Sequence, residues 1–192
     1  MSVTSAQRGT DIAVNQPYLL PPMTPTLAHP LPKPGLIEGG LARWREVLAG
    51  HYMRLSDRSR RLRFLSPVNK PIIEAMTQNA RPAAVLGIEI DGQVRAVLEI
   101  FHTEENHAEI GLSVEDAYQG RGLGRRLFDA GLSVAADLGI ETADFFFDSE
   151  NVRIRSLVKR AGAKMRSLGG GEVTAAINIA TAIAVRSHKA TV

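Results

Sequence analysis

A glycine-rich turn joins an alternating apolar pattern to an amphipathic helix pattern within residues 107–138, and this junction constrains the fold most. Apolar residues take every second position of 107–114 and one face of 122–138. Glycines let the backbone approach a ligand closely, and the first N–H groups of a helix have no partner inside it. The junction therefore predicts an anion site, best suited to phosphate. Its turn reads Gln119-Gly120-Arg121-Gly122-Leu123-Gly124.

The distribution of charge supports a phosphate site at this turn. Residues 119–126 hold three arginines and no acidic residue, whereas 81–118 hold two arginines and eight acidic residues. The dinucleotide-binding fingerprint does not fit, because Arg125 stands where its third glycine is needed. The Walker phosphate loop does not fit either, because no Gly-Lys-Ser/Thr follows.

The periodicity of the remaining segments predicts an α+β domain. Three short helices come first, three meandering strands follow, and a helix, a strand, a helix and a hairpin complete the order. This order predicts a central mixed, mostly antiparallel β-sheet flanked by α-helices. The expected helices are 41–52, 57–62, 71–76, 122–138 and one that Asn151 caps; the expected strands are 85–90, 94–101, 107–114, 143–147, 163–168 and 173–180.

Length and composition predict one folded domain with flanking segments. The chain has 192 residues, of which 44% are hydrophobic, and no cysteine. Seven of the ten prolines fall in 1–36, which we expect to be an extended or disordered arm. The domain is expected over 37–180, with a tail over 181–192. Neither a membrane span nor a signal peptide is recognisable, so we expect a cytoplasmic protein.

Two blocks of the chain resemble the GNAT superfamily of acyl-CoA-dependent N-acetyltransferases. The first is the Gln-x-x-Gly-x-Gly turn with a strand before it and a helix after it. The second is the Asn151-led helix with Ala161-Gly162-Ala163 behind it. The resemblance covers about 37–180 and implies a GNAT-like fold. It also implies transfer of an acetyl group from acetyl-CoA to a primary amine, by direct attack in a ternary complex.

The resemblance also implies which residues bind the coenzyme. Backbone N–H groups of 119–124 would hold its pyrophosphate, the backbone of 112–114 would pair with its pantetheine arm, and Asn151 would hydrogen-bond that arm. The N–H of Val114 would stabilise the oxyanion and so take part in catalysis. The expected coenzyme-binding residues are Leu112, Ser113, Val114, Gln119, Gly120, Arg121, Gly122, Leu123, Gly124, Arg125 and Asn151.

An amine acceptor requires a general base, because an amine with a pKa near ~10.4 is almost wholly protonated at pH 7. Glu109 is the expected catalytic base and Glu99 the alternative. Strand alternation puts Glu109 on the other face of the strand from Ile110, unless a bulge changes the face on which its side chain lies. Many members of the superfamily place a tyrosine in the Asn-led helix as the general acid. Here Val158 stands at that position, and Ser156 is the nearest hydroxyl.

Other interpretations remain open at this stage. The missing tyrosine allows a non-catalytic acyl-CoA-binding regulatory module, and the basic cluster 58–63 allows a nucleic-acid-associated protein, although we do not expect a nucleic-acid partner. No metal site is expected, since the histidines follow no familiar ligand spacing. The acceptor is a small molecule or a protein. A homodimer would be allowed if the strand 173–180 lay at an edge of the sheet. The three phenylalanines of 145–147 are expected to be buried in the core.

Overall fold

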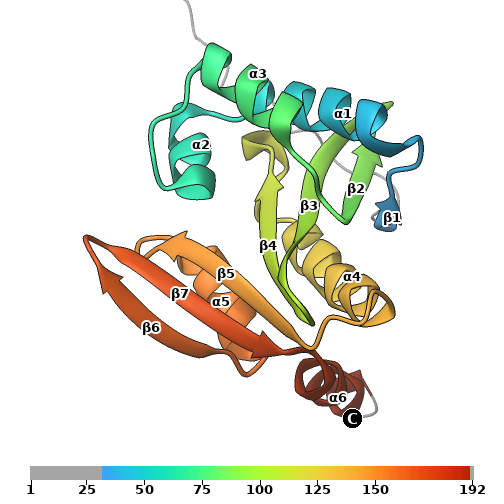
Figure 1. The fold of residues 1–192 in the computed structure, drawn as a ribbon, viewed down its shortest axis with the longest axis vertical. Coiled ribbons are helices and arrows are strands. Elements are labelled where there is room, and N and C mark those ends of the chain that lie inside the picture. The colour runs from blue at the N-terminus through green and yellow to red at the C-terminus, as the bar shows by residue number, and fades with distance from the viewer. Residues whose placement is uncertain (1–31, 191–192) are drawn as a thin grey trace, which may run out of the picture.

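The computed structural model describes residues 32–190, which form one mixed sheet with helices on both faces (Figure 1). The elements in chain order are β1 Gly35–Leu36, α1 Gly40–Arg54, α2 Asp57–Phe64, α3 Lys70–Asn79, β2 Ala84–Ile90, β3 Gln93–Glu104, β4 His107–Val114, the 3-10 helix η1 Asp116–Tyr118, α4 Leu123–Asp137, β5 Thr142–Asp148, α5 Val152–Arg160, β6 Lys164–Gly169, β7 Glu172–Asn178 and α6 Ile179–Ala190. The strand order is β1-β2-β3-β4-β5-β7-β6. Every adjacent pair is antiparallel except β4 with β5.

The alternation of strand side chains divides the core into two clusters. Leu98 faces α4, where it packs with Leu127 in the larger cluster. Val97, the preceding residue of β3, faces the opposite way and packs with Leu48 of α1 and Ile73 of α3. The predicted α+β architecture is confirmed, because both faces of the sheet carry helices as the apolar periodicity requires.

The strands β4 and β5 are paired only at their beginnings. His107, Ala108 and Glu109 pair with Thr142, Ala143 and Asp144. Beyond these residues the two strands diverge, as Figure 1 shows. Among the described residues, the edge of β4 that faces β5 therefore has no ladder partner after Glu109. Backbone groups on this edge are open to a ligand that binds as an added strand.

Several sequence expectations are corrected by the structure. Phe146 is 44% exposed rather than core, because it points away from the buried side chains of Phe145 and Phe147. Residues 173–180 do not form an edge, since β7 lies between β5 and β6, and the edge strand there is β6. Gly35, assigned to the arm, pairs with Gly87 of β2. Residues 1–31 of that arm lie outside the described residues.

The expected tail, 181–192, is helical as far as Ala190. Arg186 of α6 donates to the backbone carbonyl of Asp129 and to the Ser133 hydroxyl, both in α4. Ile179 and Ala182 are buried in the larger cluster. Helix α6 is therefore part of the folded domain. No helix among residues 32–190 has the length and apolarity needed to cross a membrane.

Candidate active site

Two pockets adjoin one another where β4 and β5 diverge. One, of about 430 Å³, surrounds the glycine turn, and we call it the glycine-turn pocket. The other, of about 700 Å³, contains Glu99 and Glu109, and we call it the acidic pocket. Residues that line both pockets mark the border between them: Leu62, Arg63, Leu112, Asn151 and Ile154.

The glycine turn has the backbone geometry of an anion cradle. Gly120 and Gly122 have φ values of 75° and 80°, which favour glycine, and Gly122 caps the N-terminus of α4. A Cβ atom on either glycine would meet no atom within 4 Å. The backbone there is consequently open to a ligand, and the N–H groups of the first turn of α4 point out of the helix. The exposed Arg125 also lines the pocket.

The coenzyme-binding residues expected from the sequence gather at this pocket, with one exception. Arg121 does not line it: its guanidinium donates to the carbonyl of Ala117 at 2.8 Å and lies 5.4 Å from the centre of the Tyr118 ring. Leu123 is almost fully buried. The residues from the expected set that line the pocket are Leu112, Ser113, Val114, Gln119, Gly120, Gly122, Leu123, Gly124, Arg125 and Asn151.

The N–H of Val114 faces the open edge of β4. The N–H of Glu115, the next residue, donates to the carbonyl of Arg95 in β3 at 2.9 Å, and successive N–H groups of a strand point to opposite sides. The carbonyl of Val114 accepts from Nε2 of Gln119 at 2.9 Å, and the same Nε2 lies 3.2 Å from the Ser59 hydroxyl of α2. Gln119 therefore fixes the end of β4 and leaves the N–H of Val114 on the side of the pockets.

The pairing of β3 with β4 settles the orientation of Glu109. It is continuous from Ala96–Val114 to His102–Ala108, so no bulge interrupts β4 between Ala108 and Val114. Glu109 thus keeps the parity expected from alternation and projects into the acidic pocket. It is half-buried there.

An ion pair that the sequence analysis did not predict occupies the border of the acidic pocket. Nη2 of Arg63 donates to Oε2 of Glu99 at 3.0 Å. Burial lowers the pKa of Arg63 to about 10. Burial also raises the pKa of Glu99 to about 8, and the carboxylate of Glu109 acts in the same direction. Because the guanidinium favours the ionised form of Glu99, protonation of Glu99 and its contact with Arg63 oppose each other.

Gly111 of β4 makes room for this ion pair. A Cβ atom at Gly111 would lie 1.9 Å from Nη2 of Arg63 and 2.8 Å from Oε2 of Glu99. The signal was present in the sequence, since a glycine inside a regular strand often marks the close approach of another group.

Helix α5 contributes polar groups to both pockets. Oδ1 of Asn151 accepts from the N–H of Ile154 at 3.3 Å, so Asn151 caps the helix with its oxygen and does not use its amide nitrogen for the cap. Val158, at the position of the tyrosine expected from the resemblance, is fully buried in the core. Ser156 is exposed and lines the glycine-turn pocket.

A buried polar network lies directly behind Ser113. Nε2 of His51 in α1 lies 2.9 Å from the Ser113 hydroxyl oxygen, and His51 is 0% exposed. Nδ1 of His51 lies 3.6 Å from Oε1 of Glu115. Glu115 also accepts from Arg54 at 2.6 Å and from Arg95 at 2.9 Å. The sequence analysis missed His51, although a histidine on the buried face of an amphipathic helix was a usable signal.

The described part of the chain offers no metal site. Among residues 32–190, no group of three or more histidine, aspartate and glutamate side chains is arranged to hold a metal ion.

The mixed sheet opens between β4 and β5, and a glycine turn leads from β4 into α4. The chain matches the Acetyltransferase (GNAT) family over residues 52–163 and belongs to it. A segment of 60 residues is 35% identical to the mycothiol acetyltransferase of Propionibacterium freudenreichii subsp. shermanii. That segment covers 31% of this chain and 19% of the relative, so the chain spans less than a fifth of that relative in the match.

Solved structures show the same fold at low sequence identity. The GNAT domain of PAT from S. lividans is 22% identical with a TM-score of 0.62, and the match covers 76% of this chain and 89% of that one. A domain from Methanocaldococcus jannaschii is 16% identical with a TM-score of 0.60, covering 76% and 98%. The PaiA N-acetyltransferase of Thermoplasma acidophilum, solved in complex with coenzyme A, is 15% identical with a TM-score of 0.55, covering 76% and 99%.

Proposed function

We propose that this protein transfers an acetyl group from acetyl-CoA to a primary amine, by direct attack of the amine in a ternary complex. The observation that carries the proposal is the shared border of two pockets along the open edge of β4. One pocket suits an anionic coenzyme, and the other holds Glu109, which can take a proton from an amine. The two reactants would meet at Leu112, beside the N–H of Val114.

The coenzyme side of the proposal rests on the glycine-turn pocket. Its open glycine backbone, the helix N-terminus and Arg125 match a pyrophosphate, and the open strand edge at 112–114 matches an extended amide-bearing arm. Asn151 lines both pockets and has amide donors to offer such an arm. Acetyl-CoA supplies the activated acetyl group when it is bound. The N–H of Val114 is assigned to the oxyanion that develops on the acetyl oxygen.

The acceptor side rests on the acidic pocket. Glu109 is the proposed general base because its side chain lines this pocket, whereas the carboxyl of Glu99 is already engaged by Arg63. Phe101 and Phe146 also line the pocket, so its walls are partly aromatic. This combination favours a primary amine attached to an apolar group, carried by a small molecule or by a protein.

A non-catalytic acyl-CoA-binding module remains the second candidate. The observation that favours it is Val158, which is fully buried and has no hydroxyl with which to protonate the leaving thiolate. It predicts coenzyme binding with no turnover.

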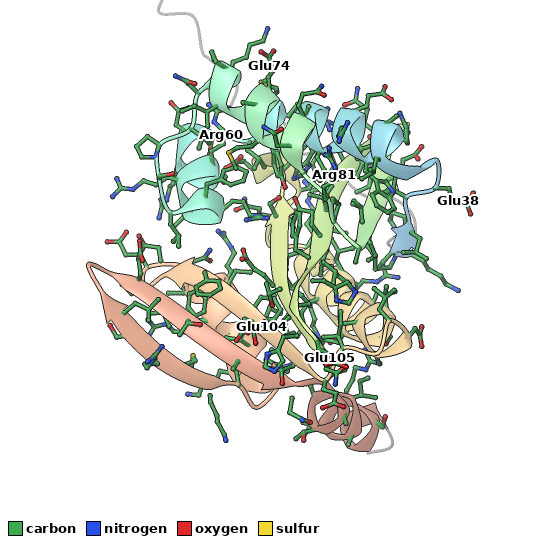
Figure 2. The ribbon with its side chains drawn as sticks, viewed as in Figure 1. Glu38, Arg60, Glu74, Arg81, Glu104 and Glu105 are labelled. Atoms are coloured by element: carbon green, nitrogen blue, oxygen red, sulfur yellow. The ribbon has the colours of Figure 1, made fainter. Side chains whose placement is uncertain are left out.

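A nucleic-acid-binding role receives little support from the basic cluster 58–63. Arg60, labelled on α2 in Figure 2, bonds to Asp57 and to the carbonyl of Tyr52, and Arg63 turns inward to Glu99. These two arginines are therefore engaged inside the protein rather than presented to a phosphate backbone.

The test is release of free thiol from acetyl-CoA in the presence of spermidine, tyramine, lysine or a short peptide with a free N-terminus. We expect turnover with at least one of these amines and a loss of about 10²–10⁴-fold in kcat for Glu109→Gln, with acetyl-CoA binding retained. Glu104→Gln is the matched control, because Glu104 lies at the end of β3 remote from α2 and lines neither pocket (Figure 2). Coenzyme binding without turnover on any amine would favour the non-catalytic module instead.

A further inference from the structure

The network behind Ser113 has the geometry of a proton relay that opens onto the glycine-turn pocket. Ser113 lines that pocket and precedes Val114 on the open strand. Its hydroxyl oxygen lies 2.9 Å from Nε2 of His51, which is 0% exposed. His51 lines neither pocket, so its link to the pocket runs through the Ser113 hydroxyl.

The charges around His51 set the direction of this hydrogen bond. Burial alone would raise the pKa of Glu115, but the neighbouring His51 ring and the hydrogen bonds from Arg54 and Arg95 outweigh it and hold the pKa below its ordinary value. Glu115 is thus a carboxylate, and it faces Nδ1 of His51 at 3.6 Å. A carboxylate beside Nδ1 favours the tautomer with its proton on Nδ1. Nε2 then carries the lone pair and accepts the Ser113 proton.

The same surroundings keep His51 neutral before reaction. Burial lowers the pKa of His51, and the charge of Arg54 acts in the same direction, whereas Glu115 and the carbonyl of Val94 oppose them. A neutral imidazole with a free Nε2 lone pair can take up one proton and give it back. Among the described residues Nδ1 of His51 has no partner at normal hydrogen-bond distance, while Arg54 and Arg95 already bind Glu115. A role in simply holding Glu115 therefore does not account for His51.

We infer that Ser113, supported by His51 and Glu115, carries one proton from the attacking amine nitrogen to the departing sulfur. This inference rests on the proposed acetyl transfer. It assigns to Ser113 the protonation of the departing sulfur, which Val158 cannot perform. Ser113 is assigned as a catalytic residue because it lines the coenzyme side of the border. His51 and Glu115 act through it and are positioning residues.

The proton balance uses two separate groups. An ammonium acceptor must lose two protons, and Glu109 takes the first and passes it to solvent. As the carbon–nitrogen bond forms, the second proton moves to the Ser113 oxygen while the Ser113 proton moves to Nε2 of His51. When the carbon–sulfur bond breaks, Nε2 returns its proton to Ser113, which gives its own to the sulfur. The products are the amide, the free thiol and one proton in solution.

The first test uses coenzyme A itself and needs no acceptor. Nitrogen NMR of the histidine side chains in the full chain should show His51 protonated on Nδ1 and unprotonated on Nε2 at pH 7. Saturating coenzyme A should shift the Nε2 resonance of His51 in the wild-type protein, and this response should disappear in Ser113→Ala. Proton occupancy on Nε2, or no response of His51 while coenzyme A binds, would overturn the relay.

The second test separates the relay from a structural role. Ser113→Ala and His51→Gln should lower kcat by about 10²-fold or more, with the KM for acetyl-CoA unchanged, in variants that unfold at the wild-type temperature. Ser113→Thr keeps the hydroxyl and should restore most of kcat. Wild-type turnover by Ser113→Ala would refute the relay and leave the acetyltransferase proposal standing. No turnover by the wild-type protein with any amine would overturn both.

Discussion

Gly111 is the residue whose lack of a side chain has the largest structural consequence. A glycine inside a strand normally destabilises it relative to alanine by about 0.5–1 kcal/mol. At Gly111 the missing Cβ leaves the space in which the Arg63 guanidinium crosses β4 to reach Glu99. The usual preference for alanine is therefore expected to reverse.

Gly111→Ala should destabilise the protein by about 1–3 kcal/mol, because displaced Arg63 would leave Glu99 buried without its partner. The measurement is the free energy of unfolding in urea for Gly111→Ala, Arg63→Ala and the double variant. Since both changes disrupt the same hydrogen bond between Arg63 and Glu99, Gly111→Ala should cost less when Arg63 is already absent. Additive effects of the two substitutions would contradict this account of Gly111.

The raised pKa of Glu99 gives a second prediction at this scale. Burial lifts this pKa from 4.5 to about 8, so folding favours the protonated acid. The resulting stability is complete below pH 4.5 and is lost as the pH rises through about 8. Glu99→Gln keeps a neutral hydrogen-bonding group and should remove this loss. Unfolding free energies at pH 5, 7 and 9 should therefore fall more for the wild type than for the variant; parallel curves would show that Glu99 titrates normally.

Polar contacts hold the start of helix α2. None of its residues is buried, yet it carries Arg63 to the acidic pocket and Ser59 to Gln119. Asp116, just after β4, holds its start: it accepts from the N–H of Ser56 at 2.9 Å and from the hydroxyls of Ser56 and Ser59 at 2.7 Å each. The start of α2 is thus held by a carboxylate, whereas its last residue, Phe64, packs against the smaller core cluster with its ring 4.9 Å from that of Tyr52.

Acid should loosen this attachment. Burial disfavours the Asp116 carboxylate, but its hydrogen bonds from Ser56 and Ser59 outweigh that effect and lower its pKa below 3.8. The stabilisation is present above pH 3.8 and is lost as the pH falls through the lowered value. Asp116→Asn should cost about 1 kcal/mol at pH 7, since the site is partly exposed, and much less at pH 2. An equal cost at both pH values, measured by urea unfolding, would contradict the assignment.

The sequence was informative about elements and less so about contacts between them. The strand 107–114 and the caps Ser56 and Asn151 were predictable because side-chain alternation and capping are local. The extension of α6 to Ala190 was not, because its stability comes from Arg186 and apolar contacts with α4. The glycine turn, like the caps, was predictable because it depends on residues adjacent in the sequence. His51 and Arg63 could not be placed from the sequence, because they reach their partners only through tertiary packing. His51 is 62 residues from Ser113, and Arg63 is 36 residues from Glu99.

At the scale of the whole molecule, the proposed function depends on two parts of one sheet that separate. The strands β1–β4 carry α1–α4, the strands β5–β7 carry α5, and three residue pairs join β4 to β5 (Figure 1). The positive block 119–126 lies beside one pocket, and carboxylates from the negative block 81–118 line the other. This arrangement would attract an anionic coenzyme to one side of the border and leaves Glu109, together with Arg63 and Arg81, on the other.

The central claim, that the glycine turn binds acetyl-CoA through its phosphates, is tested most directly by calorimetric titration at two salt concentrations. Gly122→Val and Gly162→Val are measured beside the wild type as matched variants. Both glycines have φ 80° and open space at Cβ, but only Gly122 lines the pocket. Valine at either position adds similar backbone strain, of about 1–2 kcal/mol.

We predict saturable binding in the micromolar range that weakens with salt, at least about tenfold weaker binding by Gly122→Val, and wild-type binding by Gly162→Val. A folded wild-type protein that does not bind acetyl-CoA, or a Gly122→Val variant that binds it as tightly as Gly162→Val does, would contradict the account.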